Sequence, residues 1–448
     1  MDYAVRVSHY VDPVTFELQR DVILLISGSH VAEVIVGGEV SGGLDGLAEH
    51  TLDFDSALCL PGFVNSHAHL DLSHLHRQVP NGLSFPEWAP AVIAGRALPQ
   101  PMIDAGIDDA CRMLVASGTT SVLDISVNGD SAPFLSKHGL QGLLALEVLG
   151  WSGDAAENAM QHADEIVRAK FTLDRDRLGE DAGDANAPVK LAGVDYAFSP
   201  HAPYSTSMEL YQHAFGRAFG EGRVCTTHVA ESREEEQFIR DGSGPLRDLL
   251  GKLGIDLSSF KGFDKTPIAL LLDDWLMPWL PRKGSDPVFP SQKQGLTPSP
   301  GTPQLVLVHC NYAREDDFDL LANTKPSVCW CPRSHAYFGH EPWPLAKMRE
   351  SGVNLVLGTD SLASNDGLDM LGEIREAANH PDADVTELFK AATVNGRKAL
   401  GVGQDAADLA IWGLPPGDKL DELLQGMLKN ETPLYAGFAR GNLIARAI

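Results

Sequence analysis

Two histidines separated by one residue are the first candidates for chemistry in this sequence. His67 and His69 end a run of apolar and strand-forming residues that begins at Leu58. Because side chains two positions apart in an extended strand point to the same side, both imidazoles would face one point. Paired imidazoles of this kind bind transition metals. The pair alone is a weak motif, so the interpretation depends on partners elsewhere in the chain.

Further residues that could bind a metal follow later apolar runs. His228 could supply a third nitrogen, and Asp360 could supply a carboxylate oxygen. This donor set suits Zn²⁺, with Fe²⁺ and Mn²⁺ as alternatives. Two-metal barrels commonly bridge their ions with a modified lysine at a strand end, whereas Lys190 begins its strand. The sequence therefore predicts one divalent metal ion with four ligands: His67, His69, His228 and Asp360.

A carboxylate beside the third ligand could move protons. A bound divalent ion lowers the pKa of its water from about 15.7 towards 7, which makes hydroxide available at neutral pH. Glu231 follows His228 by three residues and could act as general base and then as general acid. His309 and Asp360 could orient the water, and Asp360 could also pass a proton to the leaving group. The acidic run 234–236 resembles a solvated helix start. We expect catalysis by Glu231, His309 and Asp360.

The elements that must position these residues form a regular pattern. Eight apolar, strand-like runs alternate with helical patterns, which indicates a parallel sheet buried on both faces. Eight such units predict an α/β fold with a closed (β/α)8 TIM-type barrel, whose chemistry lies where the strands end. The runs are the one ending at His67, 118–125, 143–148, 189–198, 224–228, 305–309, 327–331 and 353–358.

The two ends of the chain predict a second, smaller unit. Residues 1–58 and 401–448 contain short strand patterns and flank the barrel at 59–400. We expect the two ends to pair as one small β-sandwich. The barrel carries an insertion at about 253–303, rich in Pro, Gly and Ser in its later part. It could be a lid over the site, a contact in a homo-oligomer or a tolerated excursion.

Composition limits the partners and the compartment. The net charge is −26, with 61 acidic against 35 basic residues. Such a field repels nucleic acid and anionic membranes, so we expect a small-molecule substrate instead. No segment is long and apolar enough to span a bilayer, and the first residues lack the pattern of a signal peptide. We therefore expect a cytoplasmic protein whose six cysteines are reduced core residues.

Several motifs follow one another in order across nearly the whole chain. They occupy residues 61–70, 199–205, 228–231, 308–310, 331–334 and 357–365. With these motifs the chain resembles the amidohydrolase superfamily, in the branch of adenosine-type, S-adenosylhomocysteine, guanine and cytosine deaminases and chlorohydrolases. It is also similar to aminodeoxyfutalosine deaminases. The resemblance implies metal ligands at the four positions above, a proton shuttle at Glu231 and water orientation by His309. It also implies substrate contacts at His201, Glu87 and Trp88.

One motif departs from this branch. Trp330 stands where many relatives have a substrate-binding histidine, and His335 stands where asparagine is usual. Trp330 could stack on a planar ring. Arg333 could bind a carboxylate or phosphate, or it could be a surface arginine. Together with Ser334 of the same motif, these residues complete the predicted substrate-binding set.

Three functions remain open from the sequence. The first is hydrolytic deamination of an amino-substituted heterocycle, with a purine base or nucleoside as the main candidate, by attack of metal-bound hydroxide and release of ammonia. The second uses the same site to hydrolyse a cyclic amide or to remove a ring-bound leaving group such as chloride. The third is a metal-stabilised scaffold or binding protein without catalysis.

Overall fold

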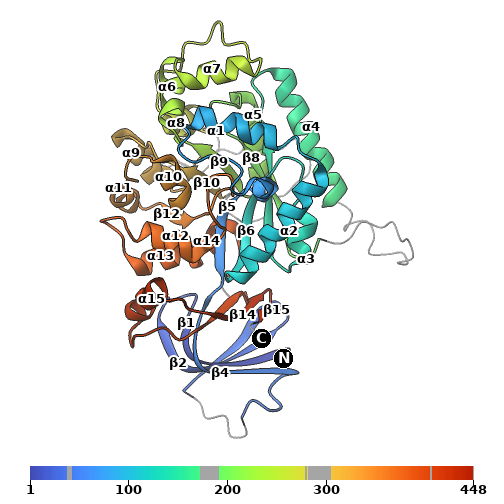
Figure 1. Ribbon diagram of the computed structural model, residues 1–448, viewed down its shortest axis with the longest axis vertical. Helices are drawn as coiled ribbons and strands as arrows, with labels where there is room; N and C mark the ends of the chain where they lie inside the picture. Colours follow the sequence, from blue (N-terminus) through green and yellow to red (C-terminus); the bar gives the residue numbers. More distant parts are fainter. Residues whose placement is uncertain (38–42, 172–190, 278–279, 281–303, 404–405, 447–448) are drawn as a thin grey trace, which may run out of the picture.

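The structure is a computed structural model that describes residues 1–37, 43–171, 191–277, 280, 304–403 and 406–446. A barrel surrounded by helices forms the larger part, and a smaller β domain that contains both ends of the chain lies below it in Figure 1. The strand β4 (His50–Pro61) begins in the β domain and leads into the first barrel strand. The carboxyl ends of the barrel strands therefore face away from the β domain.

Eight parallel strands form the barrel, as predicted. Each pairs with its neighbour in the chain, and a bridge between Ala68 and Asp360 joins the first strand to the segment after the last. Buried Val, Leu, Ile, Ala and Cys side chains fill the interior. The predicted residues 189 and 190, including Lys190, lie outside the described part of the chain. The strands are β5 (Phe63–Ala68), β6 (Thr119–Ser126), β7 (Gln141–Val148), β8 (Val194–Pro200), β9 (Cys225–Val229), β10 (Leu305–His309), β11 (Ser327–Trp330) and β12 (Asn354–Leu357).

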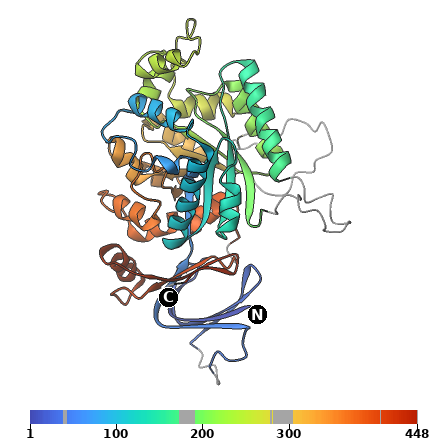
Figure 2. The ribbon, with the colours of Figure 1, turned by 45° about the vertical axis from the view of Figure 1, so that its right-hand side comes forward.

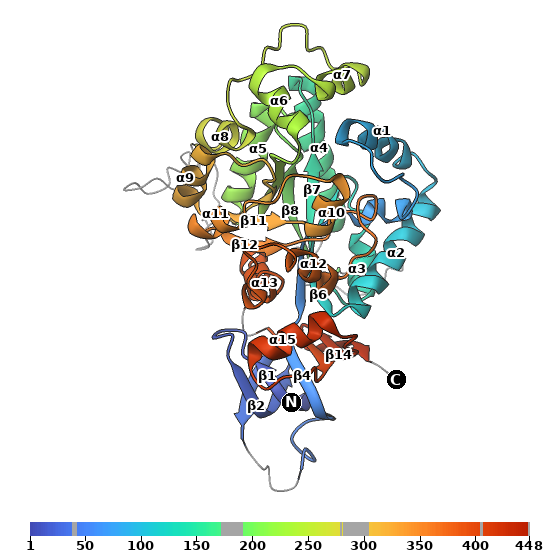
Figure 3. The ribbon, with the colours of Figure 1, turned by 60° about the vertical axis from the view of Figure 1, so that its left-hand side comes forward.

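Helices cover the outside of the barrel and one end of it (Figure 3). Many begin at a Ser, Thr or Asp whose side chain accepts a backbone N–H of the first turn, for example Ser207 and Ser232. None of the described helices is long and apolar enough to cross a membrane. They are η1 (Leu70–Leu75), α1 (Phe85–Gly95), α2 (Gln100–Ala116), α3 (Ala132–Lys137), α4 (Gly153–Lys170), α5 (Met208–Gly220), α6 (Arg233–Asp241), α7 (Pro245–Lys252), α8 (Pro267–Ala269), η2 (Leu270–Trp275), α9 (Glu315–Thr324), α10 (Pro332–Phe338), α11 (Leu345–Glu350), α12 (Met370–Ala377), α13 (Val385–Ala391), α14 (Val394–Leu400) and α15 (Leu420–Lys429).

The two ends of the chain form one β domain, as predicted. Its seven strands make a single mixed sheet in which β4 pairs with β13, so the N- and C-terminal segments meet at that pair. Tyr3 of β1 contacts Phe438 of β14 across two intervening strands, because the sheet curves over its own core (Figure 2). The remaining strands are β1 (Tyr3–Val11), β2 (Leu18–Ser27), β3 (His30–Val36), β13 (Leu409–Gly413), β14 (Leu434–Ala439) and β15 (Asn442–Arg446).

The first part of the predicted insertion packs against the barrel. Residues Leu270–Leu272 and Trp275 are buried in the main core, beside α5 and α9. Residues 281–303 lie outside the described part. All six cysteines are buried and unpaired, as predicted.

Candidate metal centre and cavity

The carboxyl ends of four barrel strands bring together the five residues on which the sequence prediction depends. His67 and His69 lie at the end of β5, His228 in β9, His309 at the end of β10, and Asp360 just after β12. All five are buried. His69 Nε2 lies 3.2 Å from His228 Nε2, and Asp360 Oδ1 lies 3.6 Å from His67 Nε2 and 3.9 Å from His69 Nε2.

The donor atoms fit a divalent cation. Those of His67, His69 and Asp360 lie within 4.8 Å of one another, as do those of His67, His228 and His309. Both ring nitrogens of His67 are buried without a hydrogen-bond partner among the described residues. Buried imidazoles are normally hydrogen-bonded, so these nitrogens need another partner. A metal ion would supply one, and three nitrogens with one carboxylate suit Zn²⁺.

Neighbouring groups hold the donors in the required states. His228 Nδ1 donates to the carbonyl of His201 at 2.9 Å, which leaves Nε2 free to face the cluster. Asp360 Oδ2 accepts from Ser334 Oγ at 2.7 Å, and Oδ1 accepts from the backbone N–H of Ser361 at 2.8 Å. Burial opposes ionisation of Asp360, but His67 and the other imidazoles hold the pKa of this carboxyl well below its usual range.

The backbone at this rim is strained. Ala230, His309, Cys310 and Asp360 adopt left-handed conformations with φ between 50° and 73°. Such conformations cost non-glycine residues on the order of 1–3 kcal/mol each, and they concentrate at functional sites. Gly358 lets β12 approach β5, because a Cβ there would lie 2.8 Å from the backbone of His67. The packing of the barrel therefore imposes the convergence of the donor side chains.

Glu231 lies beside the cluster rather than in it. Its Oε1 is 3.6 Å from His309 Nε2, and its side chain is buried. Burial, together with the charges of Asp360 and Glu235, raises the pKa of Glu231 well above its usual range. A carboxyl group with a raised pKa can hold a proton near neutral pH and release it to a reacting group.

Glu235 was missed as a site residue by the sequence analysis, which assigned the acidic run 234–236 to a solvated helix start. The structure corrects this, because Glu235 is fully buried. Its two carboxylate oxygens accept the backbone N–H groups of Ala230 and Glu231, at 3.1 and 2.8 Å. The spacing Ser232-x-x-Glu235 is the signal that could have revealed it, because a glutamate at this position commonly turns back towards the helix start.

We predict that replacing Glu235 by Gln lowers turnover roughly 10- to 100-fold. An amide offers one acceptor oxygen, so one of the two N–H groups would face an NH₂ group and the loop carrying Glu231 would shift. The buried, unpaired donor should also lower the free energy of unfolding by about 1–3 kcal/mol. Steady-state kinetics and denaturant titration measure both effects. Unchanged kinetics in the variant would show that Glu235 does not position Glu231.

A cavity of about 1000 Å³ opens from the cluster. His69, His228, Glu231, His309 and Asp360 line its inner end. Its outer walls are largely apolar and come from α1, the segment after β7 and α7, at the end of the barrel away from the β domain (Figure 3). Residues 253–256, the start of the predicted insertion, also line it. The apolar wall includes Phe85, Trp88, Leu149, Trp151, Leu246 and Leu250.

Two of the predicted substrate contacts lie in this cavity. His201 lines it, and burial lowers the pKa of this imidazole to about 4, so the ring is neutral at neutral pH. Trp88 also lines it, and its indole N–H donates to the carbonyl of Ala363 at 3.0 Å. Ser334 instead binds Asp360, as described above. In this structure Ser334 supports the carboxylate of Asp360 and does not line the cavity.

Two predicted contacts, Glu87 and Trp330, lie away from the cavity. Glu87 is exposed and its carboxylate accepts the backbone N–H of Ser84, which caps α1. Trp330 stacks on Trp343, with ring centroids 4.9 Å apart, and does not reach the cavity. Neither of these side chains lines the cavity beside the cluster.

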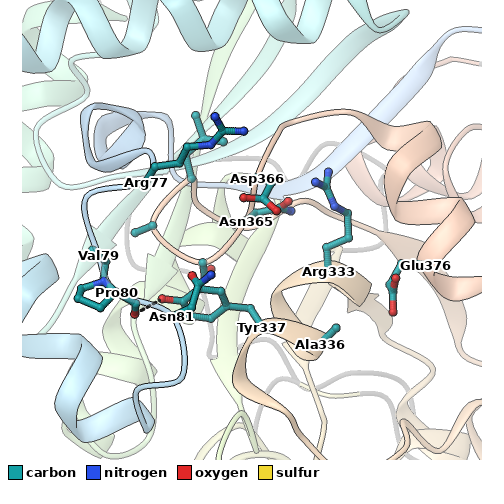
Figure 4. Close-up of a pocket in the computed structure, with 13 residues that line it drawn as sticks. Arg77, Val79, Pro80, Asn81, Arg333, Ala336, Tyr337, Asn365, Asp366 and Glu376 are labelled. Atoms are coloured by element: carbon teal, nitrogen blue, oxygen red, sulfur yellow. Dashed lines mark hydrogen bonds between the residues drawn. The ribbon is translucent and has the colours of Figure 1, made fainter.

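Arg333 lies in a separate pocket of about 690 Å³ (Figure 4). It shares that pocket with Arg77, Tyr337 and Asp366, and its guanidinium lies 4.0 Å from the buried carboxylate of Glu373. The predicted grip of Arg333 on a substrate anion therefore does not apply to the cavity beside the cluster.

Comparisons with known proteins agree with this architecture. The model of the amidohydrolase family matches residues 58–443. A 5-methylthioadenosine/S-adenosylhomocysteine deaminase of Thermococcus onnurineus is 26% identical over 376 residues, which cover 81% of this chain and 74% of the relative.

Two solved structures share the fold. The aminofutalosine deaminase of Helicobacter pylori, in complex with methylthio-coformycin, superposes with a TM-score of 0.78 at 19% identity and covers 99% of this chain and 100% of its own. The atrazine chlorohydrolase of Arthrobacter aurescens, complexed with zinc, has a TM-score of 0.73 at 17% identity, with 99% and 95% covered.

Proposed function

The chain belongs to the amidohydrolase family, and we propose that it is a metal-dependent hydrolytic deaminase of a purine nucleoside or a related amino-substituted heterocycle. Family membership makes it a hydrolase acting on carbon–nitrogen bonds. The observation that carries the proposal is the position of Glu231, a buried carboxyl group beside a cluster of metal-binding side chains at the inner end of a large cavity. The deaminase activity of the curated relatives supports the same reaction.

We assign the metal to His67, His69, His228 and Asp360, with Zn²⁺ as the preferred ion and Fe²⁺ or Mn²⁺ as alternatives. A divalent ion held there would activate a water molecule as the nucleophile. The zinc in the related chlorohydrolase supports this choice of ion.

Three side chains, Glu231, His309 and Asp360, would then orient the water and move the protons. Glu231 would take the proton from the water and deliver it to the ring nitrogen beside the attacked carbon. His309, 3.6 Å from Glu231, would hold the water in line. Asp360 would take the second proton of the attacking water and pass it to the amine, so that the carbon–nitrogen bond breaks and ammonia leaves.

The cavity suits a substrate of this size. Ligand sites of roughly 300–1,000 Å³ accept small organic molecules, and this cavity of about 1000 Å³ reaches that upper limit. Its apolar outer wall favours a substrate with an uncharged portion beyond the reacting ring. Trp88 and His201 are the predicted contacts that lie within it.

A second function uses the same groups. Removal of a ring-bound leaving group such as chloride, or hydrolysis of a cyclic amide, would need the same activated water and the same carboxyl group. The fold shared with the atrazine chlorohydrolase favours keeping this alternative.

A substrate panel separates the two functions. We would incubate fully metallated protein with adenosine, 5′-methylthioadenosine, S-adenosylhomocysteine, adenine, guanine, cytosine and a chlorinated triazine, and measure ammonia and chloride. We expect ammonia from at least one purine nucleoside, with kcat/KM of about 10⁴ M⁻¹ s⁻¹ or more. Chloride release without ammonia would favour the second function. No product from any substrate would contradict both.

A further inference from the structure

A carboxylate that no predicted role accounts for lies in the wall of the cavity. Glu147 is the next-to-last residue of β7, and its side chain is only 3% exposed. Its Oε1 is buried and has no hydrogen-bond partner among the described residues. An unpaired buried acceptor costs about 1–3 kcal/mol. Because Oε1 is unpaired and belongs to the wall of a ligand cavity, we expect a hydrogen-bond donor of the ligand to bind it.

The second oxygen of this carboxylate, Oε2, lies beside an arginine. Glu147 Oε2 lies 3.5 Å from Arg96 Nη2, and Arg96 Nη1 donates to Asp71 Oδ2 at 2.8 Å. Arg96 follows α1 and Asp71 lies in η1, so the two acidic groups hold the guanidinium between separate elements. The arginine lies beside Oε2 and orients the side chain, while Oε1 stays without a protein partner among the described residues, in the wall of the cavity.

A second acceptor faces the first. His201 Nε2 lies 3.9 Å from Glu147 Oε1. The Ser205 hydroxyl donates to the carbonyl of Ala202, so it accepts the hydrogen of His201 Nδ1, 2.5 Å away. Nε2 therefore carries a lone pair and acts as an acceptor. Two acceptors 3.9 Å apart suit a ligand that brings hydrogen-bond donors to both.

The location of this pair fits the sugar of a nucleoside. The carbonyl of His201 accepts a hydrogen bond from His228 Nδ1. The other ring nitrogen of His228, Nε2, faces His69 and the metal cluster. The ligand atoms of Glu147, His201 and His228 lie within 4.8 Å of one another, so the pair lies directly beside the metal cluster and lines the same cavity. A vicinal diol offers two hydroxyl donors on neighbouring carbons to acceptors that lie 3.9 Å apart, whereas a free base carries no hydroxyl group.

We propose that Glu147, held by Arg96, accepts a hydrogen bond from a hydroxyl group of the substrate's ribose and makes the enzyme selective for ribonucleosides. This inference rests on the proposed deaminase function and specifies its substrate class. A site built to bind a hydroxyl rejects the analogue that lacks it, because its buried acceptor is then left unpaired. The carboxylate also disfavours a phosphate at this position.

The test compares one nucleoside with its 2′-deoxy and 3′-deoxy analogues, using whichever nucleoside of the panel releases ammonia. The wild-type protein should show kcat/KM roughly 10- to 100-fold higher for the ribonucleoside than for at least one analogue. The variant Glu147→Leu should lose a similar factor with the ribonucleoside and show little further penalty with that analogue. Glu147→Gln keeps one acceptor oxygen and should recover part of the discrimination.

The ratio of two substrates in one preparation does not depend on how much of the protein is folded. Glu157→Gln, which changes an exposed carboxylate on the helix after β7, is the matched control and should keep the wild-type ratio. Equal losses for all substrates in Glu147→Leu, or a wild-type protein that does not discriminate, would overturn the inference while leaving the deaminase function intact. Ammonia from free bases alone would likewise overturn it. No ammonia from any substrate would overturn the proposed function itself.

Discussion

Replacing Glu231 by Gln is expected to lower kcat by about 10²- to 10⁴-fold, while the metal stays bound. The amide cannot take or give a proton, so general base and general acid catalysis are both lost. The metal should remain because the proposed ligands are His67, His69, His228 and Asp360, and Glu231 belongs to none of the candidate ligand groups among the described residues. Ammonia release and elemental analysis of the same preparation measure the two quantities.

An exposed carboxylate provides the control for this variant. Glu209→Gln removes a similar charge at the start of α5 and should leave turnover and metal content unchanged. If Glu231→Gln kept turnover within tenfold of the wild type, Glu231 would not be the proton shuttle. If the variant lost its metal, Glu231 would instead belong to the metal site.

The second large effect is expected when a metal-binding histidine is removed. His67→Ala should reduce the bound metal from about one equivalent to near zero and lower kcat at least 10³-fold. Changes to groups that only support a ligand already cost 10- to 100-fold in affinity, and a direct ligand should cost more. His67 is the sharpest choice because both of its buried ring nitrogens have no other partner among the described residues.

The measurement combines elemental analysis with assays before and after addition of excess Zn²⁺. His213→Ala, which removes an exposed histidine on α5, is the control and should bind metal as the wild type does. Chelation of the wild-type protein should reproduce the loss of activity, and added metal should restore it. Stoichiometric metal in His67→Ala would show that His67 is not a ligand.

The sequence predicts the barrel well because the signals are local. Each barrel strand is a short, continuous apolar run, and the polar residues that follow these runs necessarily meet at one rim of a parallel barrel. His67, His69, His228, His309 and Asp360 converge for this reason alone. The pairing of the two chain ends was predictable from strand patterns on both sides of the barrel.

Side-chain direction at the rim was less predictable, because distant partners decide it. Trp330 turns to Trp343, and Arg333 lies near Glu373, so neither enters the cavity. Glu87 caps its own helix. Each residue stands in a segment that the sequence correctly placed near the site, but the local pattern does not encode which way the side chain points.

The same dependence on distant partners explains why two residues of the cavity were not predicted. Glu147 lies within the apolar strand β7 and belongs to no motif in the sequence, and Arg96 follows α1 with no motif around it. Their relation depends on a contact across 51 residues of chain. Only the folded barrel brings the carboxylate, the guanidinium and His201 to one wall of the cavity.

The central claim is that one divalent ion is bound by three histidines and one aspartate. Anomalous X-ray diffraction from crystals of the metallated protein, recorded on both sides of the absorption edge of the metal, tests it most directly. We expect a single strong peak within about 2.0–2.2 Å of a nitrogen of His67, His69 and His228 and an oxygen of Asp360. Two peaks, a peak bound by other side chains, or no peak in catalytically active crystals would contradict it.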